Sequence, residues 1–191
     1  MSKGMIFRMK KQLYYPFLPY LCQDTFAMAI YDTHTTACFT GHRTYRNTHD
    51  EELREAIRAL YAEGYRTFLS GMAMGFDLAA ARVVLELQET LAGLRLVAVV
   101  PFDGAERRFD HESRMLYNKI IGSAAEVVIL ADNYHPGAYA QRNNFLVDNS
   151  SALVAYFTGE KGGTAYTVRR ATKRGLHCRN LYVSSQLIMG F

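Results

Sequence analysis

From about Thr36 onward, short apolar runs alternate with longer stretches that carry apolar residues at helical spacing. The apolar runs predict six strands, at residues 37–39, 67–69, 94–100, 125–130, 152–157 and 177–183. A helix is predicted after each of the first five, and the helices after the third and fourth strands are expected at residues 106–121 and 141–149. Because strands that alternate with helices in this way form right-handed βαβ units, the expected fold is α/β: a Rossmann-like three-layer αβα sandwich with a mostly parallel sheet.

Residues at the ends of these elements refine the prediction. Thr48 and Glu51 have capping-box spacing, which places the start of the first helix there. Gly175 follows a pair of basic residues, as expected at the end of the last helix. The run 94–100 is apolar without interruption and ends at Pro101, which is typical of a central strand covered on both faces.

The first 35 residues show neither the helical nor the strand periodicity of apolar positions. We therefore expect residues 1–35 to form an N-terminal extension outside the core. Residues 36–191 have a length suited to one ligand-binding domain. The apolar runs are far shorter than the ~20 residues that cross a bilayer, so no membrane association is expected. Polar residues and a proline interrupt residues 12–24, which does not fit a signal peptide.

Composition narrows the location and the partners. Cys22, Cys38 and Cys178 are widely spaced, which predicts free thiols in a cytoplasmic protein and neither a disulfide framework nor a zinc site. The net charge is +4, and residues 1–36 supply +2 of it, since they hold four basic and two acidic residues. The rest of the chain is mildly basic. That balance permits phosphate binding, but nucleic acid is not expected as a partner.

Glycine-containing loops follow three of the predicted strands. They hold Gly41, then Gly71 with Gly75, and finally Gly162 with Gly163. Because ligands of parallel α/β sheets bind at the carboxyl ends of the strands, we expect these loops to line one cleft. The last loop opens a helix, where free N–H groups favour an anion, and it is a candidate phosphate cradle. A tight structural turn is the alternative interpretation.

Polar side chains beside these glycines extend the candidate site. Thr164 opens the last helix, where its hydroxyl can donate to a phosphate or cap the helix. Asp77 lies near another helix start and can accept hydrogen bonds from ribose hydroxyls, although capping is the commoner use of such a residue. Thr40, His42 and Arg43 follow the first strand, and the guanidinium of Arg43 suits a bidentate phosphate contact.

The helix before the fifth strand carries Arg142 and Asn143 early and Asp148 later. Because the start of that strand lies opposite the cleft, only Arg142 and Asn143 are expected to reach the cleft. Ser70 and Met72 flank the first glycine of the second loop and are also expected at the ligand.

Tyr134, Tyr139 and Phe109 are candidates for stacking a base, with packing at the core or rim as the alternative.

The motifs of several other chemistries are absent from the sequence. The glycine loops match neither a Walker A motif nor the G-x-G-x-x-G of dinucleotide enzymes, and no nucleophile elbow is present. No residues have metal-ligand spacing, so we expect no metal.

Taken together, four motifs resemble those of the YpsA-like family of the SLOG superfamily. They are Cys38-Phe39-Thr40-Gly41-His42-Arg43, the stretch 70–77, Arg142-Asn143 with Val147-Asp148, and the stretch 159–168. The superfamily also holds the DNA-processing protein DprA and the LOG-type phosphoribohydrolases. The resemblance implies a Rossmann-like fold with a pocket for nucleotides or nucleotide-derived signals.

The resemblance also defines the competing functions. A sensor or regulatory protein that binds a phosphate-bearing ligand such as ADP-ribose or NAD, with no other cofactor, is the leading expectation. Whether the protein is an enzyme stays open. In LOG-type relatives a catalytic Glu follows the motif Thr by three residues, and Thr167 stands there. The alternative is therefore a nucleotide N-glycosidic hydrolase in which Asp77, Asp148 or Glu160 replaces that Glu. A DprA-like single-stranded DNA binder is a third hypothesis, and a homo-oligomer is left open.

Overall fold

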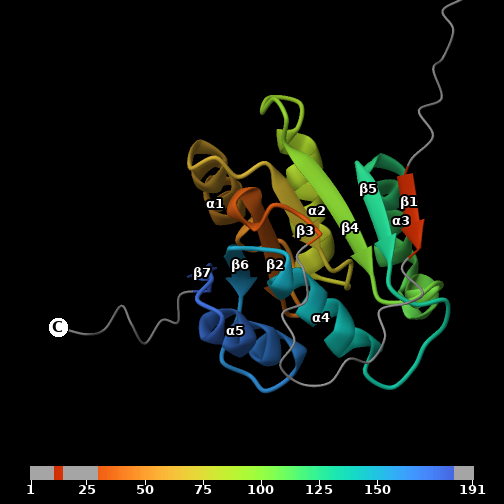
Figure 1. Cartoon of the computed structure of the whole chain (residues 1–191). Helices are drawn as coiled ribbons and strands as arrows, with labels where there is room; N and C mark the ends of the chain where they lie inside the picture. Colours follow the sequence, from red (N-terminus) through yellow and green to blue (C-terminus); the bar gives the residue numbers. More distant parts are fainter. Residues whose placement is uncertain (1–10, 15–29, 183–191) are drawn as a thin grey trace, which may run out of the picture.

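The computed structural model describes residues 11–14 and 30–182, and its strands form one sheet (Figure 1). The strand order is β1-β5-β4-β3-β2-β6-β7, and every neighbouring pair is parallel. The strands are β1 (Lys11–Tyr14), β2 (Thr36–Gly41), β3 (Thr67–Ser70), β4 (Arg95–Val100), β5 (Glu126–Ile129), β6 (Ala152–Tyr156) and β7 (His177–Asn180). The parallel sheet agrees with the prediction.

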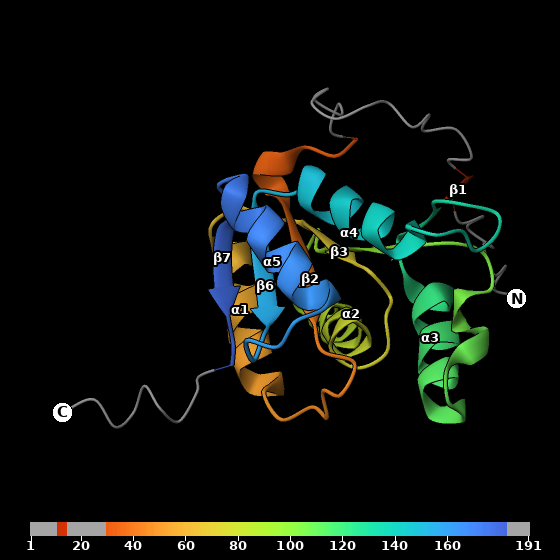
Figure 2. The ribbon, with the colours of Figure 1, turned by 90° about the horizontal axis from the view of Figure 1, so that it is seen from below.

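Helices cover both faces of this sheet (Figure 2). Side chains of α1, α2 and α3 belong to the core on one face, and those of α4 and α5 belong to the core on the other. The helices are α1 (Asp50–Ala62), α2 (Phe76–Leu87), α3 (His111–Ser123), α4 (Ala138–Asp148) and α5 (Gly163–Lys173), with short 3₁₀ turns η1 (Thr33–Thr35) and η2 (Ala105–Arg108). This three-layer arrangement confirms the Rossmann-like αβα fold.

The central strands are buried on both faces. In β2, Phe39 packs into the core beside α1 and α2, whereas Cys38 packs into the core beside α4 and α5. Residues 96–100 of β4 are buried throughout, as the unbroken apolar run predicted. Alternating side chains of a strand point to opposite faces, so a strand covered by helices on both sides has to be apolar at every position.

The start of α1 differs from the predicted capping box. The helix begins at Asp50, its N-cap is His49, and no side chain caps it. The hydroxyl of Tyr45 instead accepts a hydrogen bond from the His49 N–H at 3.0 Å and donates one to Asp50 at 2.8 Å. Thr48 contacts the His49 ring. The Tyr45 hydroxyl thus binds the backbone at the start of α1, and Thr48 makes no capping hydrogen bond.

The predicted helix at 106–121 is divided in two. Residues 105–108 form η2, Phe109 is extended, and α3 begins after Asp110, whose carboxylate accepts from the Ser113 N–H at 2.8 Å. Helix α4 starts at Ala138, earlier than the predicted Gln141, so that Tyr139 lies on the helix. The division follows from Asp110, whose side chain caps the start of α3.

Part of the predicted N-terminal extension lies against the domain. Lys11–Tyr14 forms β1 and pairs in parallel with β5, a strand that the sequence did not predict. The Tyr31 hydroxyl donates to Glu126 at 2.8 Å, and the Tyr31 ring meets Phe145 edge-on. The boundary at residue 35 remains a prediction, but these contacts tie residues on its N-terminal side to the sheet and to α4.

No helix within residues 11–14 and 30–182 is long and apolar enough to cross a membrane. Cys38 and Cys178 are free thiols, and Cys22 lies outside the described residues. Burial raises the pKa of the Cys38 thiol to about 12, so it stays protonated and serves as a small apolar core residue.

Candidate functional site

The three predicted glycine loops meet at one edge of the sheet. Strands β3, β2 and β6 are neighbours and parallel, so their carboxyl ends lie side by side. A Cβ on Gly75 would lie 2.5 Å from the carbonyl oxygen of His42, and a Cβ on Gly163 would lie 3.7 Å from the Asn143 amide nitrogen. The loops after β2 and β3 therefore touch each other, and the loop after β6 touches α4.

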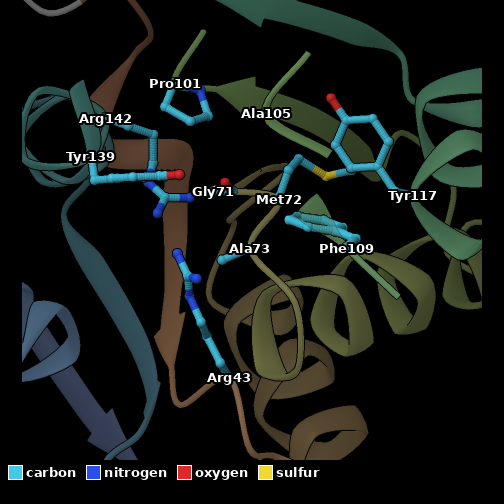
Figure 3. Close-up of a pocket in the computed structure, with 10 residues that line it drawn as sticks. All are labelled: Arg43, Gly71, Met72, Ala73, Pro101, Ala105, Phe109, Tyr117, Tyr139 and Arg142. Atoms are coloured by element: carbon cyan, nitrogen blue, oxygen red, sulfur yellow. Dashed lines mark hydrogen bonds between the residues drawn. The ribbon is translucent and has the colours of Figure 1, made fainter. Parts of the chain in front are cut away.

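A narrow hollow opens at this edge (Figure 3). Its lining residues are Arg43, Gly71, Met72, Ala73, Pro101, Ala105, Phe109, Tyr117, Tyr139 and Arg142. The enclosed part has room for little more than a water-sized group, so a larger ligand has to displace side chains at the mouth. Thr40, Gly75 and Gly163, which we expected around one cleft, do not line this hollow.

Arg142 is the central side chain of the site. It is buried, its Nη1 donates to the carbonyl oxygen of Gly71, and the same nitrogen lies 3.4 Å from Asp77 Oδ2. Its Nε donates to Asn143 Oδ1 at 2.8 Å. A Cβ on Gly71 would overlap the guanidinium, so glycine is required where this arginine crosses the loop. The expectation that Arg142 and Asn143 reach the β3–β2–β6 edge agrees with the structure.

The side chain of Asp77 is buried against Arg142 and does not reach the surface of the site. Its Oδ2 also accepts from the Ala73 N–H at 3.4 Å, so it holds both the arginine and the loop after β3. Burial raises the pKa of Asp77, and the charge of Arg142 opposes that rise. Burial likewise lowers the pKa of Arg142, although an arginine remains charged at neutral pH. The sequence hypothesis of a ribose contact gains no support from this geometry.

Arg43 supplies a second cation to the same place. Its guanidinium lies 5.6 Å from the centre of the Tyr139 ring and makes no ion pair within the described part of the chain. Figure 3 shows the guanidinium groups of Arg43 and Arg142 pointing toward each other across the hollow. Of these two cations only Arg142 pairs with a carboxylate, that of Asp77, so an anion between them would be favoured.

Asn143 continues this row of donors toward α5. Its Oδ1 faces an N–H of Arg142 that can only donate, so the amide is oriented with its NH₂ group away from the arginine and toward Gly163. Helix α5 starts after Gly162, which has φ of 145° and offers no side-chain cap. No atom of the described residues accepts a hydrogen bond from the N–H groups of Gly163, Thr164 and Ala165.

Two residues predicted at the ligand, Thr164 and His42, make hydrogen bonds between loops. The Thr164 hydroxyl donates to the carbonyl oxygen of Gly41 at 2.9 Å, so it neither caps α5 nor offers its proton to a phosphate. His42 Nε2 accepts from the Thr158 N–H at 3.0 Å, and the His42 carbonyl oxygen accepts from the Phe76 N–H at 3.2 Å. His42 thereby connects the loops after β2 and β6 with the start of α2.

Of three further residues that the sequence singled out, Met72 lines the hollow, whereas Ser70 and Asp148 make contacts within the chain. Ser70 is buried, accepts from the Met72 N–H at 3.3 Å and donates to the carbonyl oxygen of Asp77. Met72 lines the hollow and has φ of 57°, a left-handed conformation that is uncommon for a residue with a side chain. Asp148 is paired with Arg170 at 2.8 Å and Arg174 at 3.2 Å, at the far end of α4.

Aromatic side chains surround the mouth of the hollow. The rings of Phe102, Tyr134 and Tyr139 contact one another, and Tyr134 is 61% exposed. Phe109 meets Tyr117 edge-on inside the hollow. The sequence did not single out Tyr117, Pro101 or Ala105, since nothing in a helical pattern or a lone proline marks a residue as pocket-lining. Within the described residues, no three His, Cys, Asp or Glu side chains gather as a metal site.

Comparison with solved structures confirms the fold. DNA processing protein A from Streptococcus pneumoniae matches with a TM-score of 0.58 and 20% identity, over 75% of this chain and 48% of that one. The same protein from Helicobacter pylori, solved in work on its single-stranded DNA binding mode, matches with a TM-score of 0.55 and 17% identity, over 76% of this chain and 64% of that one.

This likeness corrects the expectation that nucleic acid is not a partner. The fold is one on which a protein binds single-stranded DNA, so a mild overall charge was not a sound reason for the exclusion. The physical reason is that single strands are held by a local cationic groove and stacking rings, and net charge measures neither.

Relatives in sequence point to one family. A protein of the UPF0398 group from Bacillus pumilus is 29% identical over 123 residues, which are 63% of this chain and 66% of the relative. Another, from Bacillus thuringiensis, is 29% identical over 126 residues, with 64% and 68% covered. The match thus spans about two thirds of these relatives. The YpsA family model, described as "YspA SLOG family", matches residues 29–185. Since that match covers most of the sequence, the chain belongs to the YpsA family of SLOG proteins.

Proposed function

We propose that the carboxyl edge of β2, β3 and β6 binds a nucleotide or nucleotide-derived ligand through its phosphate. One observation carries this proposal: the edge presents donors without matching acceptors. Arg43 has no carboxylate partner in the described part of the chain, the Asn143 amide points its NH₂ group toward Gly163, and the first N–H groups of α5 are free there. Unmatched donors in a row at a helix start favour a phosphate.

The aromatic side chains at the mouth of the hollow favour a base beside that phosphate. Tyr139 is 36% exposed and is covered by Arg43, and Tyr134 next to it is open to solvent. A cation–π contact at an exposed site contributes about 0.5–1 kcal/mol, whereas a hydrogen bond to a charged group contributes about 1.5–3 kcal/mol. A phosphate would therefore draw Arg43 away from Tyr139 and free the ring for stacking. This movement would also widen the narrow hollow.

The geometry supports binding over N-glycosidic hydrolysis. Thr167, at the position of the LOG-type Glu, is buried, and its hydroxyl donates to the Gly163 carbonyl oxygen at 2.9 Å. Asp77 is committed to Arg142, Asp148 to Arg170 and Arg174, and Glu160 is exposed on the loop after β6. Incubation with nucleoside monophosphates should therefore release no free base, measured by chromatography. Release that depends on one of these carboxylates would favour the hydrolase.

Thermal shift with a nucleotide panel is the direct test. The panel holds nucleoside monophosphates, ADP-ribose, NAD and a short oligothymidylate, because all present a phosphate beside a base. A ligand at 100 times its Kd that binds only the folded chain adds about 2.7 kcal/mol of stability. An unchanged Tm with every ligand of the panel would contradict the proposal.

A matched pair of variants then locates the site. Arg43→Gln removes one exposed guanidinium and should weaken the best ligand about tenfold by calorimetry, since it removes one charge-assisted contact. Arg58→Gln removes an exposed guanidinium from α1, away from the edge, and should leave the affinity within about twofold. Equal losses in the two variants would show that only net charge matters.

A further inference from the structure

A second cationic surface lies on α5, outside the hollow. The helix carries Arg169, Arg170 and Lys173, Arg174 follows as its C-cap, and none of its residues is acidic. These four residues and Tyr166 are spaced i, i+3, i+4, i+7 and i+8, which places them along one stripe of the helix. The chain therefore presents a basic stripe with an aromatic residue at its N-terminal end.

Few carboxylates offset this stripe. Asp148 of α4 pairs with both Arg170 and Arg174, so one anion serves two cations. Arg169 and Lys173 are exposed and make no ion pair with any other described residue. Arg170 also keeps a buried Nε without a hydrogen-bond partner in the described part of the chain. Within the described residues, four cations and one paired carboxylate leave this stripe with an excess of positive charge.

The opposite face of the sheet shows that this is a local property. Helix α1 carries Asp50, Glu51, Glu52 and Glu55 against Arg54 and Arg58. Figure 2 shows α1 on one side of the sheet and α5 on the other. The positive potential is therefore directed outward from the α5 side, and it is not a general consequence of a basic chain.

We propose that the outer face of α5 binds the phosphodiester backbone of a single-stranded nucleic acid. Arg169 and Lys173, one helical turn apart, contact phosphates, and the half-exposed Tyr166 stacks on a base. The Tyr166 hydroxyl donates to Asn144 at 2.7 Å, which holds the ring beside α4. This surface lies outside the hollow, and the inference does not depend on the ligand proposed there.

An acidic membrane is the competing polyanion, and the same face argues against it. Interfacial helices bury a row of large apolar side chains between lipids. Among the described residues, the large exposed apolar side chains are Ile30, Met115, Tyr134, Tyr139 and Tyr166, and of these only Tyr166 belongs to α5. One tyrosine with a polar tip suits base stacking better than insertion among acyl chains.

The test measures binding of a fluorescent oligothymidylate to the full chain over a range of salt concentrations. For single strands, log K falls with log salt at a slope of about −0.7 per phosphate contact. The double variant Arg169→Gln/Lys173→Gln should flatten that slope by about 1.4 and weaken binding about tenfold at physiological salt. The control Arg58→Gln/Arg114→Gln makes the same change in net charge on exposed sites of α1 and α3 and should alter neither quantity.

Tyr166 supplies an independent readout. Tyr166→Leu should weaken binding about tenfold, and Tyr166→Phe, which keeps the ring, should restore most of the loss. Mononucleotide affinity at the hollow should be unchanged in all α5 variants, which separates this inference from the function proposed above. Equal losses in the two double variants, tighter binding of a duplex of equal length, or binding of phosphatidylserine vesicles without binding of the oligonucleotide would each overturn it.

Discussion

Two sets of arginines in this chain make opposite use of their charge. Between α1 and α2, Arg82 pairs with Asp50 and with Glu86, and Arg54 also pairs with Glu86. Arg54 also lies 3.8 Å from Glu51, so two cations there meet three anions. At the carboxyl edge of the sheet, Arg142 pairs with Asp77, and Arg43 pairs with no carboxylate of the described residues. The first set is a closed network that joins two helices, whereas the second retains donors for a partner from outside.

Burial separates the two sets further. The α1–α2 pairs are partly exposed, and although burial raises the pKa of Glu86, Arg82 and Arg54 outweigh it and hold that pKa below its usual value. Arg142 and Asp77 are buried, and burial raises the pKa of Asp77. A partly exposed, balanced network contributes modest stability, whereas a buried and unbalanced one is costly to form and therefore points to function.

Breaking the buried pair should have the largest effect. Arg142→Met leaves Asp77 buried without its cation and should lower the free energy of unfolding by about 3–5 kcal/mol at neutral pH, measured by urea denaturation. The double variant Arg142→Met/Asp77→Leu should recover much of that loss, because no lone charge remains. A double variant as unstable as the single one would contradict the ion-pair explanation.

The free energy of unfolding of the Arg142→Met variant should show a distinct pH dependence. Without Arg142, the raised folded-state pKa of Asp77 rises further, so the folded chain binds a proton more tightly than the unfolded chain does. Stability then falls as pH rises from the ordinary aspartate value of about 3.9 through the raised value. The deficit of Arg142→Met relative to the wild type should therefore shrink as pH falls from neutral toward the ordinary aspartate value. A constant deficit would indicate that lost packing, and not charge, is responsible.

The adjacent glycines Gly162 and Gly163 should respond differently to substitution. With φ of 145° and ψ of −162°, Gly162 adopts a conformation that essentially only glycine occupies, and Gly162→Ala should cost about 1–3 kcal/mol of stability. Gly163 has no positive φ, so substitution there imposes no such strain. Gly163→Val should instead crowd the free N–H groups and the Asn143 amide, abolishing ligand binding with a small change in Tm. Unchanged ligand affinity with a lower Tm would make this loop a structural turn.

The smallest effect is expected in the balanced network. Glu86→Gln removes the carboxylate shared by Arg54 and Arg82, both partly exposed, and should cost at most about 1 kcal/mol by urea denaturation. Ligand affinity should not change, since α1 and the end of α2 lie away from the hollow. A loss of affinity in this variant would mean that the two sets of arginines are coupled through α2.

Prediction from the sequence was strongest where a signal is local. The apolar run of β4, the glycine loops after β2, β3 and β6 and the early position of Arg142 on α4 all agree with the structure. It was least specific where a side chain has a choice of partners. Thr164, His42 and Asp77 were all predicted at the ligand, yet each is bound to another part of the chain. Hydroxyl, imidazole and carboxylate groups suit either role, and spacing cannot distinguish them.

By itself, the sequence determined the alternation of strands and helices, and with it the edge of the sheet at which loops gather. Periodicity carries this information because burial of one face or of both is written into neighbouring residues. Only the tertiary structure decided that β1 joins β5, that the Tyr45 hydroxyl binds the start of α1, and that Arg142 pairs with Asp77. These contacts join residues far apart in the chain or depend on side-chain direction, and their free energy exists only once the elements have packed.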